Sequence, residues 1–317
     1  MSDRFDPPPA VALEHLIGLD GLSADRIHAL LDDAQALLPH ARGGTALRHL
    51  LAGRTVCTLF FEPSTRTRSS FHLAAKRLGA DVLNFNVATS SATKGETEAD
   101  TMRNLEAMGV DAFVVRHAGD GAIAALAAVA RPGTHFVNAG DGRSNHPTQG
   151  LLDMLTLRQA MGADWSKLTV LIVGDVRHSR VARSDLHALR ALGCGEIRVC
   201  GPAALLPGAA ELAGCRVGNH FDAALDGVDA VMMLRLQRER MDEGLVPSLE
   251  GYFRDYGLDA RRLALARPDA VVLHPGPMNR GVEIADDVAD GPQSRVLQQV
   301  ANGVAVRMAV LRAVLGA

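Results

Sequence analysis

From residue 55 onward, short apolar runs alternate with longer segments in which apolar residues recur every three or four positions. Such alternation is typical of parallel sheets whose two faces are covered by helices. The expected strands are residues 55–61, 81–87, 111–116 and 135–138 in the first half, and 168–173, 196–200, 229–234 and 270–273 in the second. The pattern therefore predicts an α/β protein with two doubly wound domains, each a parallel sheet flanked by helices.

The length of the chain also favours two domains, because 317 residues exceed what one hydrophobic core usually supports. Helices are expected at residues 64–79, 96–109, 120–131 and 147–162. A long terminal helix is predicted from apolar residues that share one face, namely Leu297, Val300, Val304, Met308, Leu311 and Leu315. We expect a first domain of residues 1–147 plus the C-terminal helix 295–317, and a second of residues 148–294, joined by interdomain helices.

Composition excludes several classes of protein. The formal charge of −3 comes from 33 basic and 36 acidic residues that are well mixed, so no basic field for nucleic acid is expected. No apolar run approaches the roughly 20 residues that span a bilayer, and the start lacks the apolar core of a signal peptide. The four cysteines show no CxxC pairing and are expected to be core thiols. We predict a cytoplasmic protein without a membrane or nucleic-acid partner, and without a metal site.

The most informative stretch is Glu62–Arg68, which reads Glu-Pro-Ser-Thr-Arg-Thr-Arg and follows the first expected strand. Ser64 is expected to be the N-cap of the next helix, whose first turn then offers backbone N–H groups, hydroxyls and guanidiniums to an anion. The alternative is a solvated helix face that carries Arg66 and Arg68. Because cations at a helix N-terminus oppose the helix dipole, a bound anion such as phosphate explains them better.

Further polar groups lie at expected strand ends or in loops, where open α/β sheets bind their ligands. Arg116 and His117 end the third expected strand, and His146-Pro147-Thr148-Gln149 opens a helix after a glycine-rich loop. The polar loop 89–96 carries Lys94. Taken alone, each has an ordinary explanation as a surface arginine, a helix cap or a solvated connection. Their joint occurrence predicts a site.

The second half also carries arginines at strand ends. The turn Gly174–Arg180 lies where a dinucleotide-binding protein has G-x-G-x-x-G, but its later glycines are missing, which argues against nicotinamide binding. Arg235-Leu236-Gln237 closes a later strand. Because a guanidinium binds a carboxylate through two parallel hydrogen bonds, Arg180 and Arg235 together suit a dicarboxylate. Residues 238–257, which are rich in charge and contain both tyrosines, are expected to form a long mobile loop.

As an ordered set, these segments resemble the catalytic chains of the aspartate/ornithine carbamoyltransferase family, and within it the aspartate-specific branch. The resemblance covers residues from about 14 to 315 and is carried by segments 61–68, 94–97, 116–117, 146–149 and 234–240, in the family's order and spacing. It implies an enzyme that transfers the carbamoyl group of carbamoyl phosphate to the amine of L-aspartate, in de novo pyrimidine biosynthesis.

The resemblance also implies a role for individual residues. The phosphate would be bound by Ser64, Thr65, Arg66 and Thr67, and the carbamoyl group by Thr67, Arg116, His146 and Gln149. Ser90 and Lys94 would reach the carbamoyl phosphate from the neighbouring subunit of a homotrimer with shared active sites. L-aspartate would be bound by Lys94, Arg180, Arg235, Gln237, Gly276 and Pro277. The catalytic residues would be Arg66, Thr67, Lys94, Arg116 and His146.

The residue types suit this chemistry. Attack of an amine on the carbamoyl carbon gives a tetrahedral intermediate whose negative oxygen needs donors such as Thr67, Arg116 and His146. The departing phosphate accepts the amine proton, so the reaction requires no protein general base and no cofactor.

Some alternatives stay open at this point. The ornithine-specific branch has a His-Cys-Leu-Pro loop in place of His274-Pro275-Gly276-Pro277, and the missing cysteine favours aspartate. Gly276 stands where the best-known member of the family has leucine. A non-catalytic scaffold need not keep every one of these polar groups. The sequence does not decide whether a trimer stands alone or assembles with regulatory chains or a dihydroorotase.

Overall fold

The computed structural model describes residues 4–86, 95–237 and 248–317. It divides into two compact units, unit 1 (Met1–Leu155 with Ala301–Ala317) and unit 2 (Thr156–Val300). Both passages between the units run inside helices, α5 (Pro147–Met161) and α11 (Val296–Leu315). The division therefore falls within these helices, whereas the sequence analysis placed the domain boundaries near their first residues.

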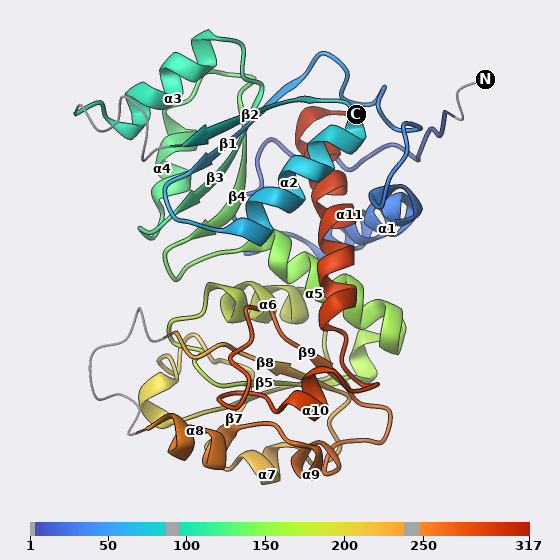
Figure 1. The fold of residues 1–317 in the computed structure, drawn as a ribbon, viewed down its shortest axis with the longest axis vertical. Helices are drawn as coiled ribbons and strands as arrows, with labels where there is room; N and C mark the ends of the chain where they lie inside the picture. The colour runs from blue at the N-terminus through green and yellow to red at the C-terminus, as the bar shows by residue number, and fades with distance from the viewer. Residues whose placement is uncertain (1–3, 87–94, 238–247) are drawn as a thin grey trace. The chain divides into compact units, whose positions relative to one another are not determined.

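Unit 1 is built on a parallel four-stranded sheet with the order β2-β1-β3-β4. Its strands are β1 (Thr55–Phe60), β2 (Asp81–Asn86), β3 (Ala112–His117) and β4 (His135–Asp141). Its helices are α1 (Ala24–Ala41), α2 (Thr65–Leu78), α3 (Glu98–Ala107) and α4 (Ala122–Ala128), with the adjoining parts of α5 and α11. Figure 1 shows α3 and α4 on one side of this sheet and α1, α2 and α11 on the other.

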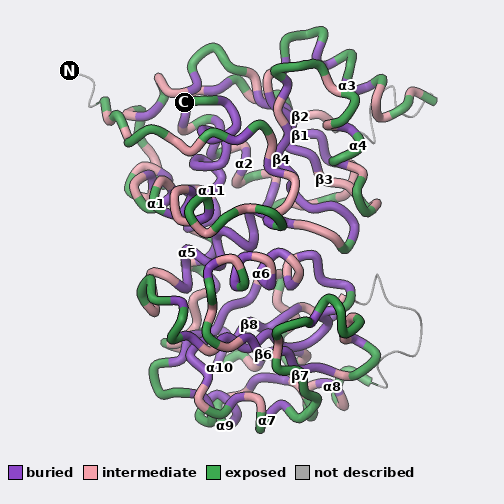
Figure 2. The backbone as a smooth tube through the Cα atoms, turned by 180° about the vertical axis from the view of Figure 1, so that it is seen from behind, coloured by how far each residue is buried: buried purple, intermediate pink, exposed green. Residues whose placement is uncertain are grey.

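The central strands β1 and β3 of unit 1 are largely buried because helices cover both faces of the sheet. Cys57 and Leu59 of β1 pack with Phe113 of β3 beneath α3 and α4, and Figure 2 shows the same strands buried. On the opposite face α2 ends at Gly79 (φ +89°), where a Cβ would lie 1.8 Å from the Arg48 carbonyl oxygen. Only glycine fits there, which fixes where α2 ends and the chain turns back to β2.

Unit 2 contains a parallel five-stranded sheet with the order β7-β6-β5-β8-β9. Its strands are β5 (Thr169–Val173), β6 (Glu196–Cys200), β7 (Arg216–Gly218), β8 (Ala230–Met233) and β9 (Val271–Leu273). The α-helices are α6 (Arg180–Ala191), α7 (Phe221–Ala224), α8 (Leu249–Tyr256), α9 (Ala260–Leu263) and α10 (Asp286–Ala289). Short 3₁₀ turns occupy Trp165–Lys167 and Ala203–Leu205.

Both sheets reverse their strand order at one point. In unit 1 the chain runs from β1 to β2 on one side and then to β3 on the other, and in unit 2 it runs from β5 to β6 and later to β8. A crevice opens at the carboxyl ends of the two strands that flank such a reversal, and open α/β proteins bind ligands there. The ends of β1 and β3, and those of β5 and β8, are therefore the places where this fold offers binding sites.

Helix α8 corrects one prediction from the sequence. Residues 238–257 were expected to form one loop, but Leu249–Tyr256 is helical and Tyr252 is buried in a cluster with Leu205 and Leu236. The charged composition hid the helix because only a short stretch is amphipathic. Residues 238–247 lie outside the described residues.

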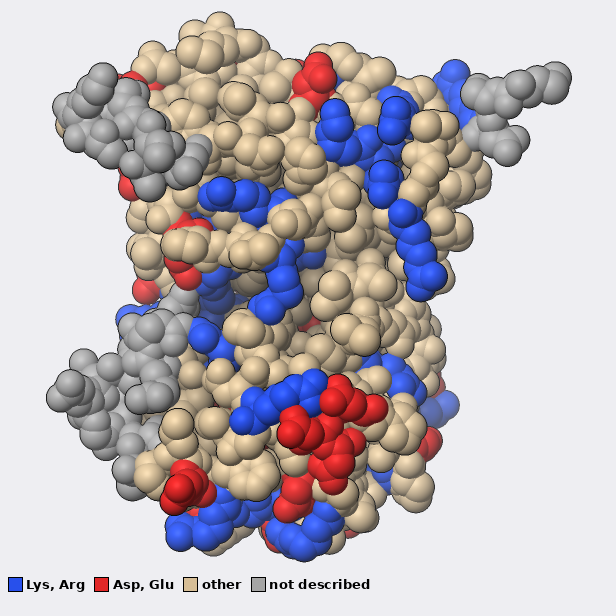
Figure 3. Space-filling view, in the orientation of Figure 1, with Lys and Arg blue, Asp and Glu red and all other residues tan. Residues whose placement is uncertain are grey.

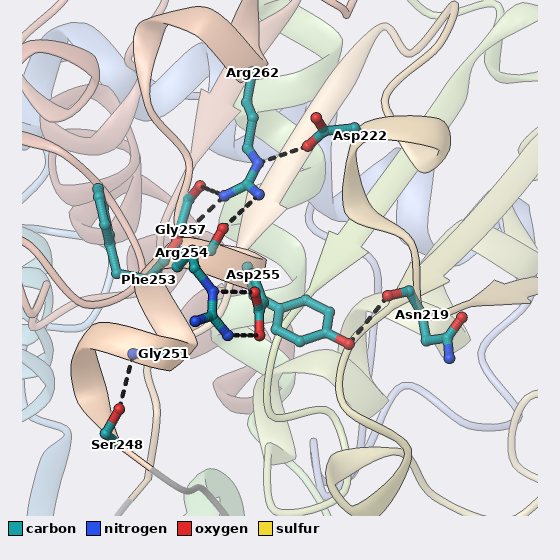
Figure 4. Close-up of polar contacts among 10 residues, drawn as sticks. Asn219, Asp222, Ser248, Gly251, Phe253, Arg254, Asp255, Gly257 and Arg262 are labelled. Atoms are coloured by element: carbon teal, nitrogen blue, oxygen red, sulfur yellow. Dashed lines mark hydrogen bonds and ion pairs between the residues drawn. The ribbon is translucent and has the colours of Figure 1, made fainter.

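Arg262 holds the C-terminal end of α8 in place (Figure 4). Its Nε donates to Asp222 Oδ1 (2.7 Å), and its two Nη atoms donate to the carbonyl oxygens of Phe253, Arg254 and Gly257 at 3.2, 2.7 and 2.7 Å. These carbonyls lie in the last turn of α8 and just after it, where a cation is favourable. The contacts explain how a charged side chain is buried at this position.

Several other local expectations need correction. Helix α1 and strand β7 were not expected, and Leu297 and Val300 of the terminal helix are 84% and 52% exposed rather than packed. Cys57 and Cys200 are buried free thiols, as expected, whereas Cys194 and Cys215 are partly exposed.

On the face drawn in Figure 3, basic side chains form groups in the upper half of the view, and acidic side chains gather mainly in one cluster in the lower half, bordered by basic ones. Among the residues that the structure describes, no helix is long and apolar enough to cross a membrane. Within the same residues, no group of three or more His, Cys, Asp or Glu side chains is arranged to hold a metal ion.

Candidate active site

The N-terminus of α2 follows β1 directly and forms the first part of the candidate site. Ser64 stands at the N-cap position with an extended backbone (φ −161°, ψ 106°), but its hydroxyl makes no capping hydrogen bond. The first turn contains no acidic residue, and it carries the exposed Arg66 and the buried Thr67. The first-turn N–H groups of a helix have no partners within the helix. An anion at this end would therefore meet backbone donors, hydroxyls and a guanidinium.

Arg116 is the second-to-last residue of β3, the strand beside β1, where it is the register partner of Phe60. Its side chain is only 11% exposed and donates to Glu62 Oε1 at 3.0 Å and to the Ala139 carbonyl oxygen at 3.2 Å. The ion pair with Glu62 ties the guanidinium to the segment that leads into α2. This places a fixed positive charge next to the helix N-terminus.

His146 is the last residue of a loop whose conformation is fixed by hydrogen bonds to Asp141. The Oδ1 atom of Asp141 accepts from Asn138 Nδ2 and from the Asn145 backbone N–H, both at 3.0 Å, and its Oδ2 accepts from the Gly121 N–H at 3.1 Å. The loop ends at His146, which is 5% exposed. These hydrogen bonds hold the loop in one conformation immediately before α5 begins.

Gln149 lies in the first turn of α5 and is 8% exposed. Its backbone N–H donates to the His146 carbonyl oxygen at 2.9 Å. Its side-chain Nε2 lies 3.0 and 3.3 Å from the two carboxylate oxygens of Asp153, one turn further along the helix. The side chains of His146 and Gln149 are thus held at the same end of α5.

In unit 2 the turn after β5 is organised around Asp175, which is completely buried. Its Oδ1 accepts from the His178 backbone N–H at 3.3 Å and lies 2.8 Å from His178 Nδ1. Burial raises the pKa of Asp175 above its ordinary value, although the hydrogen bond from His178 opposes that effect. Arg180 follows as the first residue of α6, and it is 5% exposed.

The segment after β8 lies beside that turn. The Leu234 N–H donates to the Val173 carbonyl oxygen at 2.9 Å, and the Gln237 N–H donates to Asp175 Oδ2 at 3.4 Å. Arg235 lies between them, and both Arg235 and Gln237 are partly exposed. The carboxyl ends of β5 and β8 therefore carry the two arginine-bearing segments side by side, at the point where the strand order of the sheet reverses.

The loop after β9 contains Gly276 and Pro277 and is fixed by a buried acid. His274 accepts from the Gly276 N–H at Nδ1 (2.8 Å), so its Nε2 carries the proton that it donates to Glu283 Oε1 (3.1 Å). Glu283 Oε1 also accepts from the Asn279 N–H at 2.5 Å. His274 and Glu283 have no exposed side-chain surface.

Comparison with known families shows to which family the chain belongs. The model described as "Aspartate/ornithine carbamoyltransferase, carbamoyl-P binding domain" matches residues 14–159, and "Aspartate/ornithine carbamoyltransferase, Asp/Orn binding domain" matches residues 166–314. The chain belongs to the aspartate/ornithine carbamoyltransferase family. The resemblance predicted from the short motifs is confirmed, and the two matched segments follow the two parallel sheets.

Relatives in this family are similar over nearly the whole chain. Proteins named aspartate carbamoyltransferase catalytic subunit from Xanthomonas axonopodis pv. citri and Stenotrophomonas maltophilia are 69% identical, over 96% of each chain. Aspartate transcarbamoylase from Trypanosoma cruzi, solved with carbamoyl aspartate and phosphate, is 34% identical with a TM-score of 0.86, over 98% of this chain and 99% of that one. Ornithine carbamoyltransferase from Thermus thermophilus is 28% identical with a TM-score of 0.84, over 96% and 100% of the two chains.

The structure gathers the predicted residues of this family into two groups. In unit 1 it places Ser64, Thr65, Arg66, Thr67, Arg116, His146 and Gln149 at the carboxyl ends of neighbouring strands or at the helix ends that follow them. In unit 2 it does the same for Arg180, Arg235, Gln237, Gly276 and Pro277. Ser90 and Lys94 lie outside the described residues.

The sequence analysis missed the acids that support these groups. Glu62 contacts Arg116, Asp153 contacts Gln149, Asp175 contacts Gln237, and Glu283 contacts His274. Asp153, Asp175 and Glu283 are completely buried. A charged residue within an apolar segment is a signal of this kind, because Asp and Glu are rarely buried unless they are paired.

Proposed function

We propose that this chain transfers the carbamoyl group of carbamoyl phosphate to the amine of L-aspartate, giving N-carbamoyl-L-aspartate and phosphate. This reaction is a step of de novo pyrimidine biosynthesis. The observation that carries the proposal is the arrangement in unit 1. The N-terminus of α2, which lacks a side-chain cap, and the side chains of Arg116 and His146 lie at the ends of neighbouring strands, close to where the strand order of the sheet reverses. The names of the 69% identical relatives support the same activity.

Ser64, Thr65, Arg66 and Thr67 bind the phosphate in this scheme. The helix N-terminus supplies backbone N–H groups and the positive end of the helix dipole, which favour a doubly charged anion. Arg66 adds a charge-assisted hydrogen bond. The same contacts serve the leaving group, because the phosphate gains negative charge as its bond to the carbamoyl carbon breaks.

Thr67, Arg116 and His146 stabilise the oxygen of the tetrahedral intermediate. Each donor of this kind contributes on the order of 10²–10³ in rate. The ion pair between Arg116 and Glu62 fixes the guanidinium before the substrate arrives, so little reorganisation is needed during the reaction. The departing phosphate accepts the amine proton, and the scheme uses no cofactor.

L-aspartate is bound by the polar groups of unit 2. Arg180 and Arg235 each bind a carboxylate, and Gln237 and the loop with Gly276 and Pro277 complete the site. Guanidiniums suit this task because they bind carboxylates with two hydrogen bonds. The buried Asp175 supports the assignment, since it fixes the backbone of Gln237 against the turn that leads to Arg180.

We further propose a cytoplasmic homotrimer in which Ser90 and Lys94 complete the site of the neighbouring subunit, Lys94 contacting both substrates. The edge of the sheet in unit 1 supports a subunit contact there. Strand β2 is an edge strand, its Leu83 is 37% exposed, and none of its residues from Asp81 to Phe85 is fully buried. Apolar edge strands are normally covered, because they otherwise pair with other chains. Regulatory chains or a dihydroorotase are further partners that the mass of the native complex would identify.

The activity is tested by phosphate release from carbamoyl phosphate with a panel of amines. We expect release with L-aspartate and a carbamoylated product of the matching mass, and none above background with L-ornithine, L-glutamate or L-asparagine. Release with ornithine alone would assign the chain to the other branch of the family. No release with any amine would remove the proposal.

The shared site is tested with mixed trimers of Lys94→Ala and His146→Ala chains. Each parent should be nearly inactive. After dissociation and reassembly, some interfaces join an intact Lys94 to an intact His146, so part of the activity should return. Verified hybrids as inactive as their parents would mean that Lys94 does not act across an interface.

A further inference from the structure

The contact between Gln149 and Asp153 goes beyond the roles assigned so far. Asp153 is completely buried in α5, and its two carboxylate oxygens lie 3.0 and 3.3 Å from the side-chain nitrogen of Gln149. Gln149 itself is 8% exposed. The side-chain amide of Gln149, which we propose contacts the carbamoyl group, is therefore bound to a buried acid one helical turn further along α5.

This contact decides which end of the amide faces the substrate. An ionised carboxylate only accepts hydrogen bonds, whereas a glutamine amide has one donating and one accepting end. The NH₂ group of Gln149 must therefore point at Asp153. The carbonyl oxygen Oε1, on the opposite side of the amide, is the atom left to the substrate, and it is an acceptor.

The buried cation Arg307 supports the ionised form of Asp153. Arg307 lies in α11 and is 4% exposed. Burial lowers its pKa to about 10, the negative charge of Asp153 opposes that effect, and at neutral pH the guanidinium stays charged. Its centre lies 5.1 Å from the ring of Phe71 in α2, the helix whose N-terminus forms the anion site. Arg307 of α11 thus packs against α2 and interacts electrostatically with Asp153 of α5.

Gly303 in α11 provides the space that Arg307 needs. Arg307 Nη1 folds back and donates to the Gly303 carbonyl oxygen at 2.9 Å. A Cβ at Gly303 would lie 2.5 Å from the same nitrogen and 3.3 Å from Leu152 Cδ2. Glycine inside a helix costs about 1 kcal/mol relative to alanine, and here the close approach of the guanidinium accounts for it.

We propose that Asp153 is a positioning residue that turns the accepting end of Gln149 toward the amino group of the carbamoyl phosphate. The site then selects a carbamoyl group over an acetyl group. Acetyl phosphate has the same size and charge but carries a methyl group, which cannot donate to Gln149 Oε1. This inference rests on the proposed function, since it assumes that Gln149 contacts the carbamoyl group.

The experiment compares two matched double variants of the full-length chain. Asp153→Leu with Arg307→Met replaces the buried pair by apolar side chains, which avoids leaving one charge unpaired. The control is Asp33→Leu with Arg312→Met. Arg312 is the other buried arginine of α11, it pairs with Asp33 and donates to the Pro8 carbonyl oxygen at 2.9 Å, and Asp33 and Pro8 belong to the N-terminal part of unit 1.

The readout is the discrimination ratio, defined as the Ki of acetyl phosphate divided by the KM of carbamoyl phosphate at saturating aspartate. We expect the ratio to fall about tenfold in the Asp153/Arg307 variant, the size of one well-placed hydrogen bond, and to stay unchanged in the Asp33/Arg312 variant. A purely structural defect would weaken both ligands equally. An unchanged ratio in the Asp153/Arg307 variant overturns the proposal.

Two further arms keep the result interpretable. If the Asp153/Arg307 variant does not fold, Asp153→Asn keeps the shape of the side chain. Its amide can face Gln149 with either end, so the ratio should fall at least about threefold, and an unchanged ratio overturns the proposal. If the wild-type chain shows no turnover with carbamoyl phosphate, the proposed function fails. If the wild type discriminates and every folded Asp153 variant does so equally, only the present inference fails.

Discussion

Helices α2 and α6 occupy equivalent positions in the two units, yet their N-termini are built differently. Each follows the first strand of its sheet at the point where the strand order reverses. Ser64 stands before α2 without a capping hydrogen bond, whereas the hydroxyl of Ser179 accepts from the Ala182 N–H and caps α6. The first turn of α2 carries an exposed arginine, Arg66, and that of α6 a buried one, Arg180.

The difference predicts two ways of binding an anion with the same architecture. In unit 1 the helix end itself is left for the ligand, and a phosphate suits it because backbone N–H groups converge there. In unit 2 the helix end is capped by its own serine, so the proposed site would depend on side chains such as Arg180 and Arg235. The following predictions test this contrast, from the largest expected effect to the smallest.

Arg116→Ala should lower kcat by about 10²–10³ because it removes a donor to the developing oxyanion. Phosphate affinity should change much less, since the end of α2 still binds the anion. Steady-state kinetics with carbamoyl phosphate measures both. Arg103→Ala is the control, because Arg103 is an exposed arginine of α3 that pairs only with Asp100 among the contacts described. Equal kcat in Arg116→Ala and the wild type would remove Arg116 from the reaction.

Labelling of the buried thiols should separate the two units. Burial raises the pKa of both Cys57 in unit 1 and Cys200 in unit 2 to about 12, so at pH 8 both are neutral and react only when their surroundings open. In the opened state the thiol regains its ordinary pKa of about 8.5, so below that pH the labelling rate rises about tenfold per pH unit. Carbamoyl phosphate at one hundred times its Kd should slow labelling of Cys57 about 100-fold and leave Cys200 nearly unaffected.

Mass spectrometry after timed alkylation gives the two rates. Equal protection of Cys57 and Cys200 would show that the units open together, or that carbamoyl phosphate is not bound by unit 1 alone. Either result would remove the contrast between the two units.

Arg235→Ala should raise the KM for aspartate about thirtyfold, and Gln237→Ala about fivefold, because a hydrogen bond between charged groups is worth more than one from a neutral amide. The KM for carbamoyl phosphate should stay within about twofold. Arg254→Ala is the matched control, because Arg254 is exposed and its side chain binds Asp255 on the same helix. Normal aspartate saturation in Arg235→Ala would contradict side-chain binding in unit 2.

The two serines provide the finest test. Ser179→Ala should lower the free energy of unfolding by about 1 kcal/mol, because it removes a helix cap. Ser64→Ala should leave stability nearly unchanged and instead raise the KM for carbamoyl phosphate about fivefold. Urea denaturation and steady-state kinetics on both variants give the comparison. A loss of stability in Ser64→Ala as large as in Ser179→Ala would mean that Ser64 is an ordinary cap.

Most of the fold could be predicted from the sequence, because buried parallel strands are continuous apolar runs. The rules for connections between parallel strands then leave few possible strand orders. Candidate ligands such as Arg116 and Arg235 stood out because several polar groups follow apolar runs together, although each of them alone has an ordinary explanation. Strand β7 was missed because it is short and exposed. Whether Ser64 caps its helix could not be foreseen, since that depends on one side-chain rotamer.

Contacts between distant segments could not be predicted from the sequence, for a different reason. Arg307 and Asp153 influence each other only because α11 returns to unit 1, and nothing in the local sequence pattern of either helix shows which buried charges interact. The helical form of Leu249–Tyr256 likewise depends on Arg262, whose side chain satisfies carbonyl groups at the end of that helix.

Gly303 has a consequence for attempts to make this enzyme more heat-resistant. Replacing helical glycines by alanine is a routine route to higher melting temperature, since it reduces the freedom of the unfolded chain. A library screened only for melting temperature would place alanine at this position among its first choices. The added methyl group would instead displace the guanidinium beneath α5, so selection for turnover of carbamoyl phosphate has to accompany selection for heat resistance.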